Sequence, residues 1–212
     1  MFVDHLVLGV YVFSLVIMTI FASHGFIMLY YHNKYKKNEP IGIDELSDDT
    51  FVTIQLPLYN EVYVAERLIN TVCEMEFPKD KMEIQVLDDS TDETVKVVAE
   101  LVKEKKAEGF DIVHVRRESR EGFKAGALKE GLKTAKGKYV AIFDADFVPK
   151  KDFLLKTLKH FSDDKVGMVQ TRWEHLNEDY SILTKIQALA LNGHFVIEQS
   201  VRNKAGFFIN FN

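Results

Sequence analysis

Residues 138–146 read KYVAIFDAD, and this stretch decides the fold of the chain. The apolar run predicts a strand buried on both faces of a sheet. The strand ends in two carboxylates, Asp144 and Asp146, which stand one residue apart. Two anions at one strand end repel each other and cost desolvation energy, so they need a positive partner. A second acidic pair, Asp88 and Asp89, follows another apolar run and raises the same requirement.

Outward from this stretch, short apolar runs alternate with helical patterns. We expect strands at residues 51–56, 83–87, 110–115, 138–143 and 166–171, and helices at 61–76, 92–108, 124–135, 151–161 and 180–201. This alternation predicts an α/β fold with a mostly parallel sheet covered by helices on both faces. Ligands bind such sheets at the carboxyl ends of the strands. The polar candidates fall there, in residues 57–61, residues 88–90, Asp144 and Asp146.

The composition sets broad limits on function. The length of 212 residues suits one domain plus an appendage. The net charge of −5 does not suggest nucleic acid, whose binding usually requires a basic face. Cys73 is the only cysteine, so no internal disulfide can form.

The first residues have a different character from the rest. From Leu6 to Tyr31 the chain carries no Asp, Glu, Lys or Arg, which is long enough for a membrane-spanning helix. A signal peptide would place basic residues first and have a shorter apolar core, and a buried helix is the other alternative. Here Asp4 precedes the run and Lys34 follows it, with further lysines at 36 and 37. Because positively charged residues flank membrane helices on the cytoplasmic side, the lysines predict that everything after the helix is cytoplasmic.

We therefore divide the chain into three parts. Residues 1–33 form a transmembrane helix, residues 34–50 a polar linker, and residues 51–212 an α/β domain. The acidic residues at the strand ends of this domain suit Mg²⁺ or Mn²⁺, which prefer oxygen ligands and are commonly shared with substrate phosphates. The alternative is that the aspartates are only helix caps or turn residues. Lys124 stands at a predicted helix start between two glycines. One interpretation is that it contacts a diphosphate, and the other is that this segment is only the beginning of a helix.

Five motifs together resemble family 2 glycosyltransferases, and in particular the cellulose synthase-like and glucomannan synthase branch. They are Pro57-x-Tyr59-Asn60-Glu61, Asp88-Asp89-Ser90, Lys124-Ala-Gly-Ala-Leu128, Asp144-Ala-Asp146 and Gln170-Thr-Arg-Trp173. The resemblance covers about residues 50 to 212, and the motifs occur in the order that the family has.

The resemblance implies a GT-A fold and a nucleotide-sugar donor. Tyr59 and Glu61 would border the nucleotide, and Asp88 or Asp89 would recognise the base or ribose. Lys124 would approach the diphosphate. Asp144 and Asp146 would be the metal-binding D-x-D, with Asp146 the direct ligand and Asp144 touching the ribose or reaching the metal through water. The cation, Mg²⁺ or Mn²⁺, would then offset the carboxylate repulsion and stabilise the departing nucleoside diphosphate.

The implied enzyme is a membrane-anchored inverting glycosyltransferase. It would move a hexose from a donor of the UDP-glucose or GDP-mannose type to a polysaccharide or lipid acceptor. The catalytic base of the family lies further downstream, so we expect it beyond Asn212 and expect the 212-residue piece itself to be inactive. One alternative is a non-catalytic nucleotide-sugar binder or scaffold. Another is a phosphoacceptor receiver-like domain, but its acidic pair should end the first strand, where this chain has Pro57 and Tyr59.

Overall fold

The computed structural model describes residues 2–35 and 50–207, which fall into two compact units. One unit comprises Gly42–Gly167, and the other comprises Met1–Ile41 together with Met168–Asn212. Most of the predicted linker, residues 36–49, lies outside the described residues. The single domain predicted for residues 51–212 stays a prediction.

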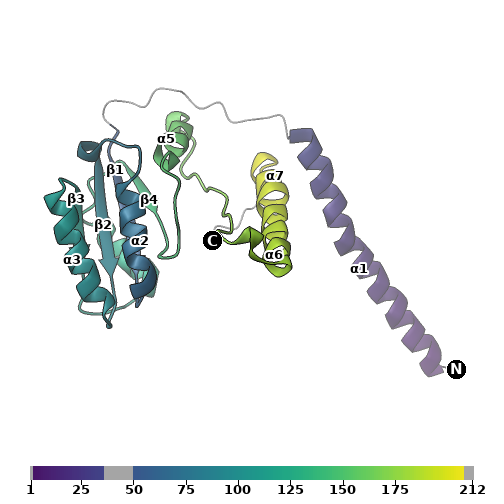
Figure 1. Ribbon diagram of the computed structural model, residues 1–212. Coiled ribbons are helices and arrows are strands. Elements are labelled where there is room, and N and C mark those ends of the chain that lie inside the picture. The colour runs from purple at the N-terminus through teal and green to yellow at the C-terminus, as the bar shows by residue number, and fades with distance from the viewer. Residues whose placement is uncertain (1, 36–49, 208–212) are drawn as a thin grey trace. The chain divides into compact units, whose positions relative to one another are not determined.

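Four parallel strands form the sheet of the first unit, in the order β3-β2-β1-β4 (Figure 1). The strands are β1 (Val52–Leu58), β2 (Met82–Asp88), β3 (Asp111–Val115) and β4 (Tyr139–Ile142). The predicted α/β fold with a parallel sheet is confirmed. β1 lies between β2 and β4, with Leu58 opposite Asp88 and Gln55 opposite Ile142. The carboxyl ends of these three strands therefore meet at one edge of the sheet.

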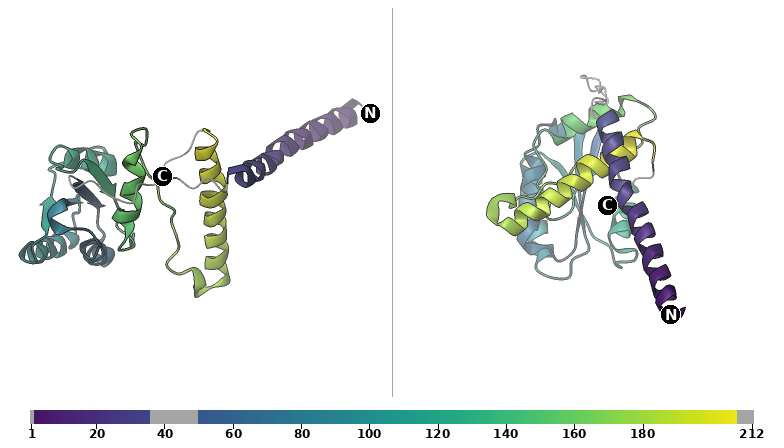
Figure 2. Two further views of the ribbon diagram at one scale, coloured as in Figure 1. Left: turned by 90° about the horizontal axis from the view of Figure 1, so that it is seen from above. Right: turned by 90° about the vertical axis from the view of Figure 1, so that its right-hand side faces the viewer.

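Helices cover both faces of the central strands β1 and β2, whereas the edge strand β4, predicted to be buried on both faces, exposes Val140 and Ile142. Two helices that pack against each other, α2 (Val62–Cys73) and α3 (Thr94–Ala107), lie on one face, and α4 (Phe123–Leu132) lies on the other (Figure 2). α2 forms because its apolar residues recur at helical spacing and bury one stripe, which contains Ala65, Leu68, Ile69 and Val72. These side chains join Ile54, Leu56, Ile84 and Val86 of the strands in one hydrophobic core.

The face of the sheet beneath α4 is polar although it is buried. Thr53 Oγ1 donates to Glu83 Oε2 at 2.8 Å, and Gln55 Nε2 donates to Gln85 Oε1 at 3.0 Å. α4 comes very close to these groups at Gly131, where a Cβ would lie 2.5 Å from Gln55 Nε2 and 2.7 Å from Gln85 Oε1. The sequence pattern did not reveal this layer, because apolar and polar residues alternate within strands that are buried on both faces.

The strand predicted at residues 166–171 is wrong for this structure. These residues are described, but they form no strand and are partly or fully exposed. A strand requires a neighbour to bond its backbone groups, and none of the described strands pairs with this segment. The predicted helix at residues 151–161 is present as α5 (Phe153–Leu158) and the 3₁₀ turn η2 (Lys159–Ser162). A further 3₁₀ turn, η1 (Lys79–Lys81), precedes β2.

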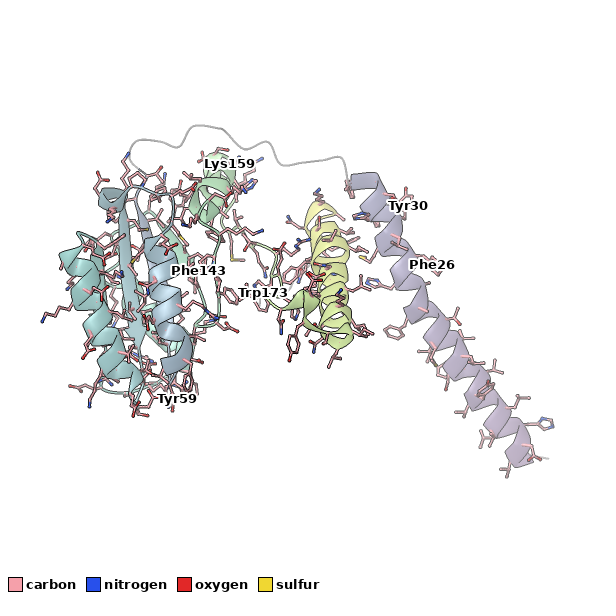
Figure 3. The ribbon with its side chains drawn as sticks, viewed as in Figure 1. Phe26, Tyr30, Tyr59, Phe143, Lys159 and Trp173 are labelled. Carbon is pink, nitrogen blue, oxygen red and sulfur yellow. The ribbon has the colours of Figure 1, made fainter. Side chains whose placement is uncertain are left out.

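The second unit is helical throughout its regular structure. It contains α1 (Phe2–Tyr35), the 3₁₀ turn η3 (Glu178–Tyr180), α6 (Ile182–Asn192), the π-helical η4 (Gly193–Gln199) and α7 (Ser200–Lys204). The last three continue one another and correspond to the long helix predicted at residues 180–201. Lys204 Nζ donates to the carbonyl of Tyr35 at 3.4 Å. α1 is long and apolar enough to cross a membrane, and side chains such as Phe26 and Tyr30 project from it, exposed (Figure 3).

Candidate donor-binding site

A cavity of about 350 Å³ lies at the carboxyl ends of the strands. Tyr59 marks this end of the sheet in Figure 3. The cavity is lined by the end of β1, by the residues that follow β2 and β4, and by the start of α4. Its lining residues are Pro57, Leu58, Tyr59, Glu61, Asp89, Arg120, Lys124, Ala127, Asp144, Ala145 and Asp146. The sequence predicts seven residues that contact the donor or the cation, and six of them line this cavity: Tyr59, Glu61, Asp89, Lys124, Asp144 and Asp146. The seventh, Asp88, does not line it.

Asp144 and Asp146 stand in the turn that follows β4. The residue between them, Ala145, is buried in the core, whereas Asp144 is partly exposed and Asp146 is exposed. Lys124 Nζ forms an ion pair with Asp144 Oδ1. The side chain of Asp146 is exposed, and the carbonyl of Asp146 accepts a hydrogen bond from Arg67 at 3.2 Å. Lys124 thus supplies a positive partner for Asp144.

The donor set fits a divalent cation that shares its coordination with phosphate. Asp144 and Asp146 offer oxygen ligands, which Mg²⁺ and Mn²⁺ prefer. In residues 2–35 and 50–207, no group of three or more His, Cys, Asp or Glu residues is placed to hold a metal ion. Two carboxylates leave most coordination positions open, which is the arrangement expected when substrate phosphates complete the shell.

Asp88 is buried inside the unit and does not line the cavity. Its Oδ1 accepts a hydrogen bond from the Ser90 amide, and its Oδ2 lies 2.8 Å from His114 Nε2. Burial raises the pKa of the Asp88 carboxyl, but the hydrogen bonds from His114 and Ser90 outweigh burial and hold the pKa below its ordinary value of 3.8. Of the two adjacent aspartates, Asp89 is the one that faces the cavity.

Asp89 is held by Arg117, a residue that the sequence reading did not single out. Arg117 Nε donates to Asp89 Oδ1 at 2.9 Å, and its NH2 group donates to Oδ2. The same guanidinium donates to the carbonyl of Glu121 at 2.9 Å and to the carbonyl of Phe123 at 3.1 Å. One side chain therefore ties the end of β2 to the start of α4.

The start of α4 has an unusual backbone. Gly122 has φ +70°, and Phe123, a large aromatic residue, has φ +50°. Non-glycine residues rarely adopt this left-handed conformation, so the bonds from Arg117 hold a strained turn. Further along, a Cβ on Gly126 would lie 2.0 Å from the carbonyl of Glu121, so only glycine fits there. This turn directs Lys124 and the amino end of α4 toward the cavity.

Tyr59 contacts a second arginine, Arg120, which the sequence analysis did not single out. The Cζ atom of Arg120 lies 3.3 Å from the centroid of the Tyr59 ring, which is a stacked cation–π contact. Both residues line the cavity. The visible signal for Arg117 and Arg120 is their spacing of three residues just before the Gly122-Phe-Lys124 turn.

The turn after β1 is fastened to the turn after β2. Asn60 adopts φ +55°, a conformation that asparagine tolerates better than most residues. Its amide donates to Ser90 Oγ at 2.8 Å, and its side-chain Oδ1 accepts from the Thr91 amide at 2.9 Å. Glu61 follows as the cap of α2, with its carbonyl accepting from Val64 and Ala65. These bonds fix where Tyr59 and Glu61 stand.

Gln170–Trp173, the last motif of the sequence reading, lies in the other unit. There Arg172 and Trp173 line a separate cavity of about 200 Å³ with residues of α6. The Trp173 ring lies 5.9 Å from the ring of Phe195, centroid to centroid.

Known proteins resemble this chain over most of its length. Residues 53–212 match the family described as Glycosyl transferase family 2. A probable glucomannan 4-beta-mannosyltransferase 7 of Oryza sativa subsp. japonica is 43% identical over 83% of this chain and 32% of its own length. Glucomannan 4-beta-mannosyltransferase 9 of Arabidopsis thaliana is 42% identical over 85% of this chain and 35% of its own. The chain thus spans about a third of the length of these relatives.

A solved structure is similar in fold as well. The mannosyltransferase from Pyrobaculum calidifontis, in complex with GDP-Man and Mn²⁺, is 30% identical, with a TM-score of 0.62. The match covers 74% of this chain and 46% of that one. The predicted GT-A type of sheet is confirmed by this likeness.

Proposed function

Because the chain belongs to glycosyltransferase family 2, we propose that its cavity binds a nucleotide-sugar donor for an inverting hexosyl transfer to a polysaccharide or lipid acceptor. The observation that carries the proposal is the convergence of Asp89, Lys124, Asp144 and Asp146 on one cavity at the strand ends. The carboxylate of Asp89 suits a base or ribose that donates hydrogen bonds. Lys124, with the carboxylates of Asp144 and Asp146, suits a diphosphate and its cation, so the cavity matches the two ends of a nucleotide-sugar.

The donor that we favour is a GDP-hexose of the GDP-mannose type. The two plant relatives are named as mannosyltransferases, and the archaeal structure holds GDP-Man. A UDP-hexose is the alternative. The Mn²⁺ of the archaeal structure supports a divalent cation here too, and we assign it to Asp144 and Asp146.

Each residue of the site then has a defined task. Lys124 and the amino end of α4 attract the diphosphate, because the helix end carries partial positive charge. Asp89, fixed by Arg117, accepts hydrogen bonds from the ribose or base. Asp144 and Asp146 hold the cation, which when bound neutralises charge on the leaving nucleoside diphosphate.

We also propose that α1 anchors the enzyme in a membrane with the donor site on the cytoplasmic side. The helix Val3–Tyr35 has the length and composition of a span, and the lysines follow it while Asp4 precedes it. Single cysteines at Asp48 and Asp4, in a Cys73→Ser background, test the orientation in intact cells. An impermeant thiol reagent should label Asp4→Cys and leave Asp48→Cys unlabelled, and the reverse pattern would contradict the proposal.

Donor binding can be tested on the 212-residue chain by titration calorimetry. We expect GDP-mannose or GDP to bind with Mn²⁺ present and binding to fall sharply when EDTA removes the metal. Asp146→Asn should lower this metal-dependent binding, whereas Lys129→Ala, an exposed cation outside the cavity lining, should not. Absence of binding to GDP- and UDP-compounds alike would refute the proposed function.

A further inference from the structure

Arg120 contacts aromatic rings through its guanidinium but leaves the N–H donors of that group available to a ligand. The side chain is exposed and lines the cavity, and its Cζ atom lies 3.3 Å from the centroid of the Tyr59 ring. Among the described residues, no protein group accepts a hydrogen bond from it, although a guanidinium carries five N–H donors. Arg117 is the opposite case, because its donors are taken up by Asp89, Glu121 and Phe123.

The contact with Tyr59 holds this guanidinium in place. A separation of 3.3 Å between Cζ and the ring centroid is close contact, so no base can enter between the two. The second aromatic neighbour, Phe123, has its ring centroid 5.1 Å from Cζ. With one face covered by Tyr59, the guanidinium offers the cavity its outer face and its edge of N–H donors. Preorganisation of this kind lowers the entropy lost when those donors bind a ligand.

The chemistry of that edge selects among bases. A planar pair of N–H donors matches two acceptors that lie side by side, as O6 and N7 do on guanine. Guanine also carries N–H donors on its neighbouring edge, which suit the carboxylate of Asp89 in the same cavity. Uracil offers no such paired acceptors. The diphosphate has other proposed partners, because Lys124 lies at the start of α4 and the proposed cation ligands Asp144 and Asp146 follow β4.

We propose that Arg120 reads the O6/N7 edge of a guanine base, that Tyr59 positions it, and that the cavity selects guanine over uracil nucleotides for this reason. The inference rests on the proposed function and adds the residue that determines the choice of base. A two-pronged arginine–guanine contact gives about 5- to 150-fold discrimination, so GDP should bind more tightly than UDP by a factor in that range.

The test measures affinities of the 212-residue chain for GDP, UDP and 7-deaza-GDP with Mn²⁺ present. 7-Deaza-GDP has a carbon in place of N7, so it keeps the diphosphate and loses one acceptor. In the unaltered protein GDP should bind best, with 7-deaza-GDP and UDP weaker. Arg120→Lys keeps the positive charge but loses the planar pair of N–H donors. It should therefore lower the affinity for GDP and leave the affinity for UDP nearly unchanged. Tyr59→Phe should keep the GDP preference, and Tyr59→Ala should reduce it.

Controls and contrary outcomes separate this inference from the proposed function. Lys129→Ala should bind all three nucleotides as the unaltered protein does, and circular dichroism should show that each variant is folded, since Arg120 is exposed. Equal weakening of GDP and UDP by Arg120→Lys would place Arg120 on the diphosphate and overturn the inference alone. Equal affinity of the unaltered protein for GDP and UDP would overturn it as well. Binding of no nucleotide would overturn the proposed function together with it.

Discussion

Asp89 and Arg117 form a two-pronged ion pair in which Arg117 Nε donates to Oδ1 at 2.9 Å and NH2 donates to Oδ2. Both side chains are largely buried, at 7% and 13% exposure. The pair joins the end of β2 to the strained turn before α4, so the position of Lys124 depends on a contact between residues 28 apart in the sequence.

Replacing Arg117 should loosen the turn and weaken the donor site together. Arg117→Lys keeps the charge but cannot bond Asp89, Glu121 and Phe123 at once. We expect the free energy of unfolding to fall by about 1–3 kcal/mol, with weaker binding of GDP, as measured by urea denaturation and calorimetry. Arg116→Lys is the matched control, because within residues 2–35 and 50–207 the Arg116 guanidinium bonds a single group, the carbonyl of Ser90 at 2.8 Å. Equal effects of the two substitutions would contradict the special role of Arg117.

The two aspartates after β4 should respond differently to loss of charge. Asp146 has an exposed carboxylate, so Asp146→Asn should leave the melting temperature of the ligand-free protein level or raise it by relieving repulsion. It should reduce the affinity for GDP with Mn²⁺ at least about tenfold, or ~1.4 kcal/mol. Asp144→Asn also removes the partner of Lys124, so it should alter the ligand-free protein as well. Thermal melting with and without Mn²⁺ and GDP checks both. An unchanged ligand-induced shift in Asp146→Asn would remove Asp146 from the metal site.

Asp88 should make stability depend on acid pH. Its folded-state pKa lies below 3.8 because hydrogen bonds from His114 and Ser90 outweigh burial. A carboxyl with a lowered folded pKa contributes stability that is fully present above its unfolded pKa and is lost as pH falls through the folded pKa. The stability difference between the unaltered protein and Asp88→Asn should therefore be largest near neutral pH and shrink below about pH 4. Denaturant melts from pH 7 to pH 3 measure it, and a difference that stays constant would contradict the contact.

Gly131 should not tolerate a side chain. Alanine is the better helix former, so Gly131→Ala would stabilise an isolated helix by ~1 kcal/mol. Here its Cβ would lie 2.5 Å from Gln55 Nε2 and 2.9 Å from Leu87 Cδ2, so overpacking should cost about 1–3 kcal/mol and displace α4. Gly193→Ala is the control, because a Cβ there meets nothing within 4 Å. Urea denaturation compares the two, and a stabilised Gly131→Ala would show that α4 stands further from the sheet.

The sequence by itself determined the α/β pattern and indicated most of the residues that line the candidate donor site. Apolar runs that alternate with helical patterns, such as the one ending at Phe143, set the parallel sheet, because both periodicities are local properties of the chain. The acidic and aromatic candidates could be found because parallel strands bring their carboxyl ends to one edge. By that geometric rule alone, Tyr59 and Asp144 are expected at one edge of the sheet, and both line the cavity there.

Tertiary structure alone decided the remaining assignments. Asp88 and Asp89 are adjacent in sequence, but the strand turns one carboxylate inward to His114 and the other outward to Arg117. The roles of Arg117 and Arg120 depend on which distant groups their long side chains reach, and sequence spacing does not encode that reach. The polar layer of Gln55 and Gln85 likewise requires a helix at close range before it can be seen. Long-range contacts decide these features because they join residues whose separation along the chain carries no periodic signal.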